Sequence, residues 1–210
     1  KVVRFCGAYH GWWDGVQPGI GNQRANQDVL TLSEGSPRTL QVLEDRKDIA
    51  CVLVNPMQLM HLNKDAPSDQ TLVVGQRVNK PQPDAYRNWL HQLQAVCARQ
   101  GIVFILDEVF TGFRLARGGA KEYFGVRPDL ITYGKTLGGG LPVGVVCGTS
   151  ELMRRFKPDR PADVCLARGT FNSHPEVMGA MNSFLRRIDS SDCSSIYEDS
   201  HATWDRRVVQ

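Results

Sequence analysis

A lysine and an aspartate are the side chains of this sequence best suited to covalent chemistry. Asp107 stands in FILDEVFTGFR, residues 104–114, directly after an apolar run. Lys135 stands in LITYGKTLGGGLPVG, residues 130–144, between another apolar run and a cluster of glycines. A lysine amine that sheds its proton can bond to an aldehyde carbon, and a carboxylate can keep a heterocyclic nitrogen protonated. The pair therefore indicates chemistry with an aldehyde cofactor such as pyridoxal phosphate.

Both residues also have plainer interpretations. Asp107 could only cap the following turn, and Lys135 could be a surface charge beside a flexible turn. A phosphate-binding loop is a third interpretation, because GKT is similar to the nucleotide-binding motif. That motif needs a glycine five positions before the glycine that precedes the lysine, and counting back from Gly134 gives Asp129. The spacing argues against nucleotide hydrolysis.

A further polar cluster, AYHGWWDG at residues 8–15, follows the opening apolar stretch KVVRFC. Tyr9 could stack on a flat cofactor ring, and His10 could donate or accept a proton beside it. Equally, Tyr9 could join Trp12 and Trp13 in an aromatic packing cluster. Residue types alone leave the role of Tyr9 open.

Short apolar runs alternate with helical patterns along the chain. Five-residue runs at 50–54 and 102–106 are rich in branched side chains, as expected of strands covered on both faces. Between them, apolar residues recur at three and four positions over 84–100, which predicts a helix. Strand, helix and strand in this order predict a parallel sheet, whose strands bind ligands at their carboxyl ends.

Further elements continue the alternation. We expect strands at 130–133 and 143–147, a short helix near 151–156 and a longer helix after Pro175, where proline suits the first turn. The stretch 55–83 shows no clear period, which predicts a long loop. The fold class is therefore α/β, a three-layer sandwich with a mostly parallel central sheet.

The composition argues against several classes of protein. The 210 residues are 41% apolar and 22% charged, as in ordinary globular domains. No apolar run approaches the ~18 residues of a spanning helix, so no membrane partner is expected. The net charge of +3 comes with scattered basic residues, which argues against nucleic acid. The six cysteines form no CxxC pair, which indicates a reducing, cytoplasmic setting and no metal site.

Four motifs taken together resemble one family. YHG, DEVFTGFR, YGKTLGGGLPVG and GTFNSHP occur in the order and at spacings of the class III aminotransferases, fold type I pyridoxal-phosphate enzymes that include glutamate-1-semialdehyde aminomutase. The resemblance covers roughly residues 1–190 and implies that they are an incomplete cofactor-binding large domain. It implies that residues 191–210 begin a helical connection to a small C-terminal domain that this chain lacks.

The resemblance assigns the chemistry to two residues. It implies that Lys135 forms a Schiff base with pyridoxal 5'-phosphate and that Asp107 pairs with the pyridine nitrogen of the cofactor. Freed by an amino donor, Lys135 would move the α-proton of the substrate to the cofactor. The implied reaction transfers an amino group from a small-molecule donor to a carbonyl acceptor.

The resemblance also implies four cofactor-binding residues around this pair. Tyr9 would stack on one face of the ring and Val109 would press on the other. His10 would lie beside the ring. Thr170, in GTFNSHP, would reach the cofactor phosphate of the neighbouring subunit, so a homodimer is expected.

Departures from the family pattern leave the substrate open. Many relatives have Glu-Pro where this chain has Asn55 and Pro56, and the upstream phosphate loop of the family is absent. The stretch RPADVCLARGTFNSHP is similar to aminotransferases encoded with polyketide or nonribosomal peptide synthases. The same Lys135 and Asp107 would also serve an aminomutase, a decarboxylase or a racemase. A further alternative is a truncated, inactive domain that acts through dimer or synthase contacts.

Overall fold

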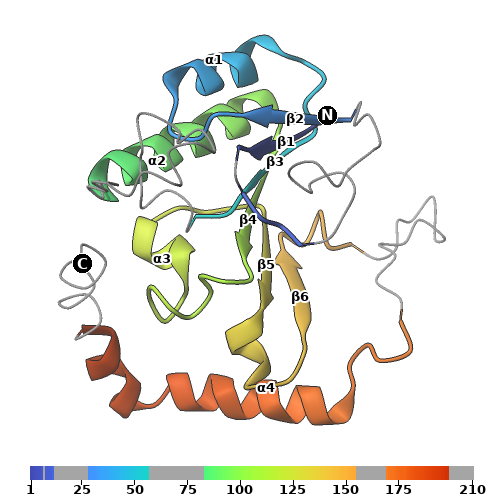
Figure 1. The fold of residues 1–210 in the computed structure, drawn as a ribbon, viewed down its shortest axis with the longest axis vertical. Coiled ribbons are helices and arrows are strands. Elements are labelled where there is room, and N and C mark those ends of the chain that lie inside the picture. The colour runs from blue at the N-terminus through green and yellow to red at the C-terminus, as the bar shows by residue number, and fades with distance from the viewer. Residues whose placement is uncertain (7, 12–27, 57–82, 155–168, 199–210) are drawn as a thin grey trace, which may run out of the picture.

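A six-stranded sheet forms the centre of the chain (Figure 1). The computed structural model describes residues 1–6, 8–11, 28–56, 83–154 and 169–198. The strands, in sheet order, are β2 (Val29–Leu32), β1 (Val2–Phe5), β3 (Cys51–Val54), β4 (Val103–Glu108), β5 (Leu130–Gly134) and β6 (Gly144–Gly148). All neighbouring pairs are parallel except β5 and β6, which are antiparallel. The predicted α/β fold with a mostly parallel sheet is confirmed.

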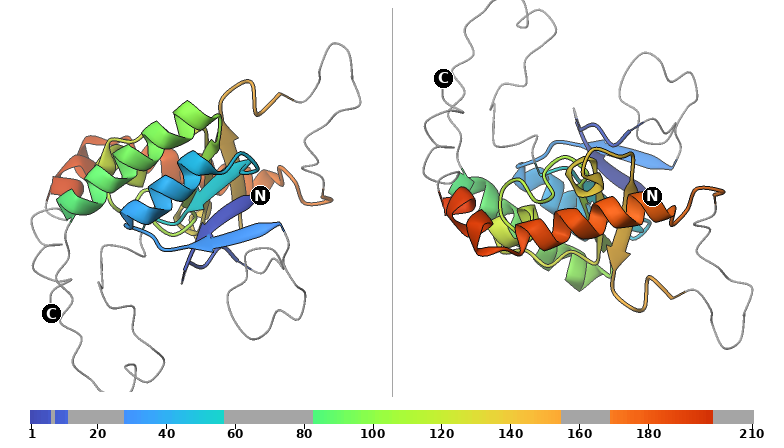
Figure 2. Two further views of the ribbon diagram at one scale, coloured as in Figure 1. Left: turned by 90° about the horizontal axis from the view of Figure 1, so that it is seen from above. Right: turned by 90° about the horizontal axis from the view of Figure 1, so that it is seen from below.

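Helices connect and cover the strands. They are α1 (Pro37–Asp45), α2 (Pro83–Gln100), α3 (Ala120–Phe124), the short 3₁₀ helix η2 (Lys135–Gly138) and α4 (Pro175–Ile188), and residues 191–198 are also helical. Helices α1 and α2 lie side by side, whereas α4 packs near η2, away from them (Figures 1 and 2). Among the described residues, no helix is long and apolar enough to cross a membrane.

The predicted helical stripe of α2 forms much of the core. Tyr86, Leu90 and Leu93 are fully buried. The ring of Trp89 meets Phe5 of β1 edge-on, with ring centroids 5.5 Å apart. Burying a large apolar side chain contributes about 1.5–3 kcal/mol. This face of α2 therefore fixes the sheet that carries the candidate site.

Three elements were not predicted from the sequence, in addition to the 3₁₀ helix η2. Strand β2 has only four residues, VLTL, and Thr31 interrupts its apolar residues. Helix α1 begins at a Ser-Pro pair, in which the Ser36 hydroxyl accepts a hydrogen bond from the amide of Arg38 at 3.3 Å. Helix α3 spans five residues, too few for a period to show.

Other expectations need correction or lie outside the description. The short helix expected near 151–156 is wrong in its described part, because residues 151–153 form a turn. A single turn is too short for its apolar residues to bury a face. The stretch 57–82 of the predicted long loop lies outside the described residues. Helix α2 begins at Pro83, one residue before the expected start.

Candidate active site

The carboxyl ends of four strands bring the polar residues of the site to one edge of the sheet. Tyr9 and His10 follow β1, Asn55 follows β3, Asp107 lies near the end of β4 and Lys135 follows β5. These four strands are consecutive and parallel in the sheet. Open α/β sheets bind their ligands at this edge.

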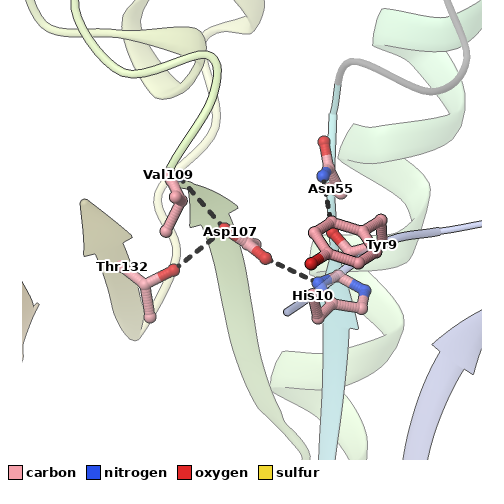
Figure 3. Close-up of polar contacts among 6 residues, drawn as sticks. All are labelled: Tyr9, His10, Asn55, Asp107, Val109 and Thr132. Carbon is pink, nitrogen blue, oxygen red and sulfur yellow. Dashed lines mark hydrogen bonds and ion pairs between the residues drawn. The ribbon is translucent and has the colours of Figure 1, made fainter. Parts of the chain in front are cut away.

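Asp107 accepts hydrogen bonds from three sides (Figure 3). Its Oδ2 atom lies 2.6 Å from Nδ1 of His10. Its Oδ1 atom accepts from the backbone amide of Val109 at 3.1 Å and from the hydroxyl of Thr132 at 3.1 Å. The side chain is 8% exposed. Asp107 therefore does cap the turn after its strand, as the plainer interpretation expects, but it also has a histidine partner.

These contacts keep Asp107 ionised. Burial by itself would raise the pKa of the carboxyl group, but the hydrogen bond from His10 and those from Val109 and Thr132 outweigh it. The pKa of Asp107 is therefore below its ordinary value of 3.8. A buried carboxylate that stays charged at neutral pH can stabilise a positive charge placed against it.

His10 must be the donor in this pair. An ionised carboxylate only accepts hydrogen bonds, so the proton of the short contact belongs to Nδ1 of His10. The His10 side chain is 2% exposed. Its Nε2 atom is buried and has no hydrogen-bond partner within the described residues. The imidazole is thus held in one orientation by Asp107.

Lys135 begins η2 in a left-handed backbone conformation. Its φ angle is +38°, which a non-glycine residue adopts at a cost of about 1–3 kcal/mol. The side chain is exposed, and Nζ lies 5.8 Å from the ring centroid of Phe110. No carboxylate pairs with Nζ in the described part of the chain, so the amine is free to meet a ligand.

Two glycines at this edge leave little room for a side chain. A Cβ atom at Gly134 would lie 3.1 Å from Cγ1 of Val109 and 3.1 Å from the carbonyl oxygen of Val143. A Cβ atom at Gly138 would lie 3.0 Å from Cγ1 of Val143. The backbone on both sides of Lys135 is therefore packed closely against its neighbours, and Val109 is placed beside the strand end that carries the lysine.

Glu108 holds the loop that follows β4. It is fully buried, and it accepts from the amides of Ala120 at 2.5 Å and Lys121 at 3.0 Å. Burial raises the pKa of this carboxyl group despite these bonds. The same loop reaches η2, because the hydroxyl of Thr136 donates to the carbonyl of Gly112 at 3.0 Å. The loop therefore connects the strand of Asp107 to the helix of Lys135.

Tyr9 is exposed at this edge of the sheet. Its side chain is 57% exposed, which leaves a ring face open to a ligand. Its backbone carbonyl accepts from Nδ2 of Asn55 at 3.2 Å (Figure 3). Trp12 and Trp13, the other members of the alternative aromatic cluster, lie outside the described residues.

Thr170 is the predicted site residue that stands apart. It lies in an exposed turn before α4. Within the described residues, no hydrogen bond joins it to Asp107, His10 or Lys135. The predicted contact of Thr170 is with the cofactor of the neighbouring subunit.

Three residues of the site were not predicted from the sequence. Thr132 pairs with Asp107 in the register of β4 and β5. Phe110 lies under the lysine amine, and Thr136 fixes η2 to the preceding loop. All three lie within three positions of Asp107 or Lys135 in the sequence. This nearness in the sequence was the only signal that pointed to them.

The residues present fit pyridoxal phosphate. A carboxylate offers about four acceptor positions, and three donors contact Asp107, so Oδ2 retains one for a pyridinium N–H. The lysine amine and the exposed Tyr9 ring come from neighbouring strand ends of the same edge. Among the described residues, no group of three or more histidine, cysteine, aspartate or glutamate side chains could hold a metal ion.

Comparison with known proteins agrees with this fit. The family described as aminotransferase class-III matches residues 83–203. A glutamate-1-semialdehyde 2,1-aminomutase from Methanocaldococcus jannaschii is 33% identical over 205 residues, which cover 90% of this chain and 43% of the relative. The chain thus spans less than half the length of this relative.

Solved structures show the same fold. A β-phenylalanine aminotransferase from Variovorax paradoxus has a TM-score of 0.71 and 28% identity, covering 96% of this chain and 42% of its own. A transaminase with pyridoxal phosphate bound has a TM-score of 0.66 and 26% identity, covering 91% of this chain and 44% of its own.

The fold and the site define a fold type I protein whose cofactor is pyridoxal phosphate. The chain belongs to the class III aminotransferase family.

Proposed function

We propose that this protein transfers an amino group from a small-molecule amino donor to a carbonyl acceptor. The observation that carries the proposal is the buried carboxylate of Asp107, which accepts three hydrogen bonds on β4, next to the strand β5 that Lys135 follows. Bound pyridoxal phosphate supplies an aldehyde that captures amines and a ring that accepts electrons. The activities for which the relatives are named only support this proposal, because the chain spans less than half of their length.

Each residue of the site has a proposed task. Lys135 would hold the cofactor through Nζ, and its amine, when free, would accept the proton from the α-carbon of the substrate. Asp107 holds the proton of the ring nitrogen, so that the ring stays electron-poor. Tyr9 and Val109 orient the ring from its two faces, and His10 keeps Asp107 in place. Thr170 binds the phosphate in the partner site.

A homodimer completes the proposed site. Several large apolar side chains are exposed, among them Val146 of β6 at 54% and Phe171 at 79%. Helix α4 buries none of its residues, although its sequence is amphipathic. Exposed apolar surface of this kind marks protein contacts. Sedimentation that shows a monomer at micromolar concentration would contradict the dimer.

The cysteines and one stretch of the sequence support the proposed cellular setting of the reaction. Four of the described cysteines, Cys51, Cys97, Cys147 and Cys193, form no disulfide, which supports a reducing cytoplasm. The stretch 160–175 supports a setting among polyketide or nonribosomal peptide synthases. Part of this stretch lies outside the described residues.

Intramolecular amino transfer is the second candidate, because the relative from Methanocaldococcus jannaschii is named an aminomutase. The two reactions differ in stoichiometry. A transaminase given only its donor releases one keto product per site, whereas an aminomutase returns an isomer of the same mass. Mass spectrometry of the products from single amino compounds separates the two.

The test of the proposal is cofactor binding by the lysine. Titration with pyridoxal phosphate should produce an absorption band near the blue edge of the visible spectrum. Lys135→Ala should abolish the band. Lys47→Ala, which removes only a surface lysine bonded to Gln100, should retain it. If Lys135→Ala keeps the band, the assignment of the lysine is wrong. If the unaltered protein lacks the band, the proposed function is wrong for this chain.

A further inference from the structure

The chain segment that carries His10 has to cross one strand of the sheet. It follows β1, whereas Asp107 lies on β4, and β3 stands between these strands in the sheet. The contact of 2.6 Å between His10 and Asp107 therefore spans the carboxyl end of β3. A segment that passes over β3 in this way needs a contact that holds it in place. Ordering a chain without regular structure costs about 1–2 kcal/mol of conformational entropy per residue.

Asn55 stands at this crossing. It is the first residue after β3, and its Nδ2 atom donates to the carbonyl oxygen of Tyr9 at 3.2 Å (Figure 3). Tyr9 immediately precedes His10. The amide group thus fixes the backbone one residue before the imidazole that contacts Asp107.

We propose that Asn55 is a positioning residue that holds His10 against Asp107 through the carbonyl of Tyr9. The role rests on the proposed function, since Asp107 matters for catalysis only if it holds the cofactor ring. The contact between His10 and Asp107, however, can be measured in the protein without cofactor.

The chemistry of the contact requires an amide at position 55. The carbonyl of Tyr9 only accepts hydrogen bonds, so its partner has to donate. Aspartate has the same shape as asparagine but offers only acceptors when ionised. It would set two oxygens against each other and add a second negative charge near Asp107. A neutral hydrogen-bond donor at position 55 therefore suits the contact with the carbonyl of Tyr9.

The experiment follows the Nδ1 proton of His10 by NMR in protein without cofactor, labelled at histidine. A short bond to a buried carboxylate protects this proton and moves its resonance far downfield. Asn55→Ala removes the donor, and Asn55→Asp replaces it with an acceptor. Both variants should lose the resonance while the chain stays folded by circular dichroism.

Asn88→Asp is the matched control. Asn88 is exposed on α2, so the same substitution there adds the same charge away from the crossing. This variant should keep the resonance. If both Asn55 variants keep it at the wild-type position, the proposed role is wrong.

Titration of the Asp107 carboxyl group by carbon NMR gives an independent measurement. In Asn55→Ala the pKa of Asp107 should rise toward its ordinary value, because the contribution of His10 is lost without any added charge. An unchanged titration would overturn the proposal even if the proton resonance is too broad to observe.

Cofactor binding then separates this role from the function itself. Asn55→Ala should weaken the binding of pyridoxal phosphate by roughly two- to tenfold, as expected for one lost hydrogen bond, and Asn88→Asp should not. If the unaltered protein fails to bind the cofactor but the Asn55 variants lose the His10 resonance, the proposed function fails and the positioning role stands. Unchanged cofactor binding in Asn55→Ala, with the resonance lost, would show that His10 does not support the cofactor site.

Discussion

His10 and Asp107 are joined by a contact of 2.6 Å between Nδ1 and Oδ2, although 97 positions separate them in the sequence. The pair is almost completely buried, with side-chain exposures of 2% and 8%. Because the carboxylate is charged in a buried position, its replacement or its protonation should have measurable effects on activity and on stability.

Replacement of Asp107 by asparagine should leave the fold intact and remove most activity. Asparagine keeps an oxygen that can accept from Val109 and Thr132 but lacks the charge that holds a protonated ring nitrogen. We expect turnover to fall by about 10²-fold or more, as for other preorganised electrostatic groups. Steady-state kinetics measure the effect. Asp48→Asn, which affects only an exposed pair with Arg46, should keep full turnover. Equal turnover in the two variants would remove Asp107 from the mechanism.

The stability contributed by Asp107 should disappear in acid. Its pKa in the folded chain lies below the ordinary value of 3.8, so the ionised form is favoured by folding. The contribution is present above pH 3.8 and is lost as pH falls through the lower, folded value. The difference in free energy of unfolding between the wild type and Asp107→Asn should therefore shrink below about pH 4. Urea unfolding across this range measures it, and a constant difference would contradict the pKa direction.

Glu34 should destabilise the fold as pH rises. Its Oε1 atom accepts from the hydroxyl of Tyr86 at 2.8 Å, and Oε2 is buried without a partner within the described residues. Burial raises the pKa of Glu34 from 4.5 to about 8. The folded chain therefore retains a proton that the unfolded chain loses, and stability falls between pH 4.5 and about 8.

Glu34→Gln tests this pH dependence, because glutamine keeps an acceptor for Tyr86 and cannot ionise. The free energy of unfolding of the variant should change less between pH 5 and 8 than that of the wild type, by on the order of 1 kcal/mol per pH unit. Equal slopes for the two proteins would show that Glu34 has an ordinary pKa.

Gly119 should tolerate alanine less well than Gly101 does. Both glycines have positive φ angles, +81° and +67°. A Cβ atom at Gly119 would lie 2.2 Å from Oε2 of Glu108, whereas at Gly101 nothing lies within 4 Å. Gly101→Ala therefore reports backbone strain alone, about 1 kcal/mol. Gly119→Ala should cost about 2–4 kcal/mol, because it also displaces a buried carboxylate. Equal losses in thermal or urea unfolding would contradict the close packing of Glu108.

The sequence by itself determined the local elements and the types of the reactive residues. Branched apolar runs and the stripe over 84–100 predicted strands β3 and β4 and helix α2, because a strand buried on both faces needs apolar residues throughout and a helix needs them every three or four positions. The same runs predicted that Asp107 and Lys135 each follow a strand. Short elements such as β2 and α3 left no such pattern.

Only the tertiary structure decided which residues meet. The pairing of Asp107 with Thr132 depends on the register of β4 and β5, and its contact with His10 depends on the order of β1, β3 and β4 in the sheet. Strand order and register are fixed by long-range packing against helices such as α2, which no local spacing records. The sequence therefore indicates which groups are reactive, and the packing of the sheet determines which side chains they contact.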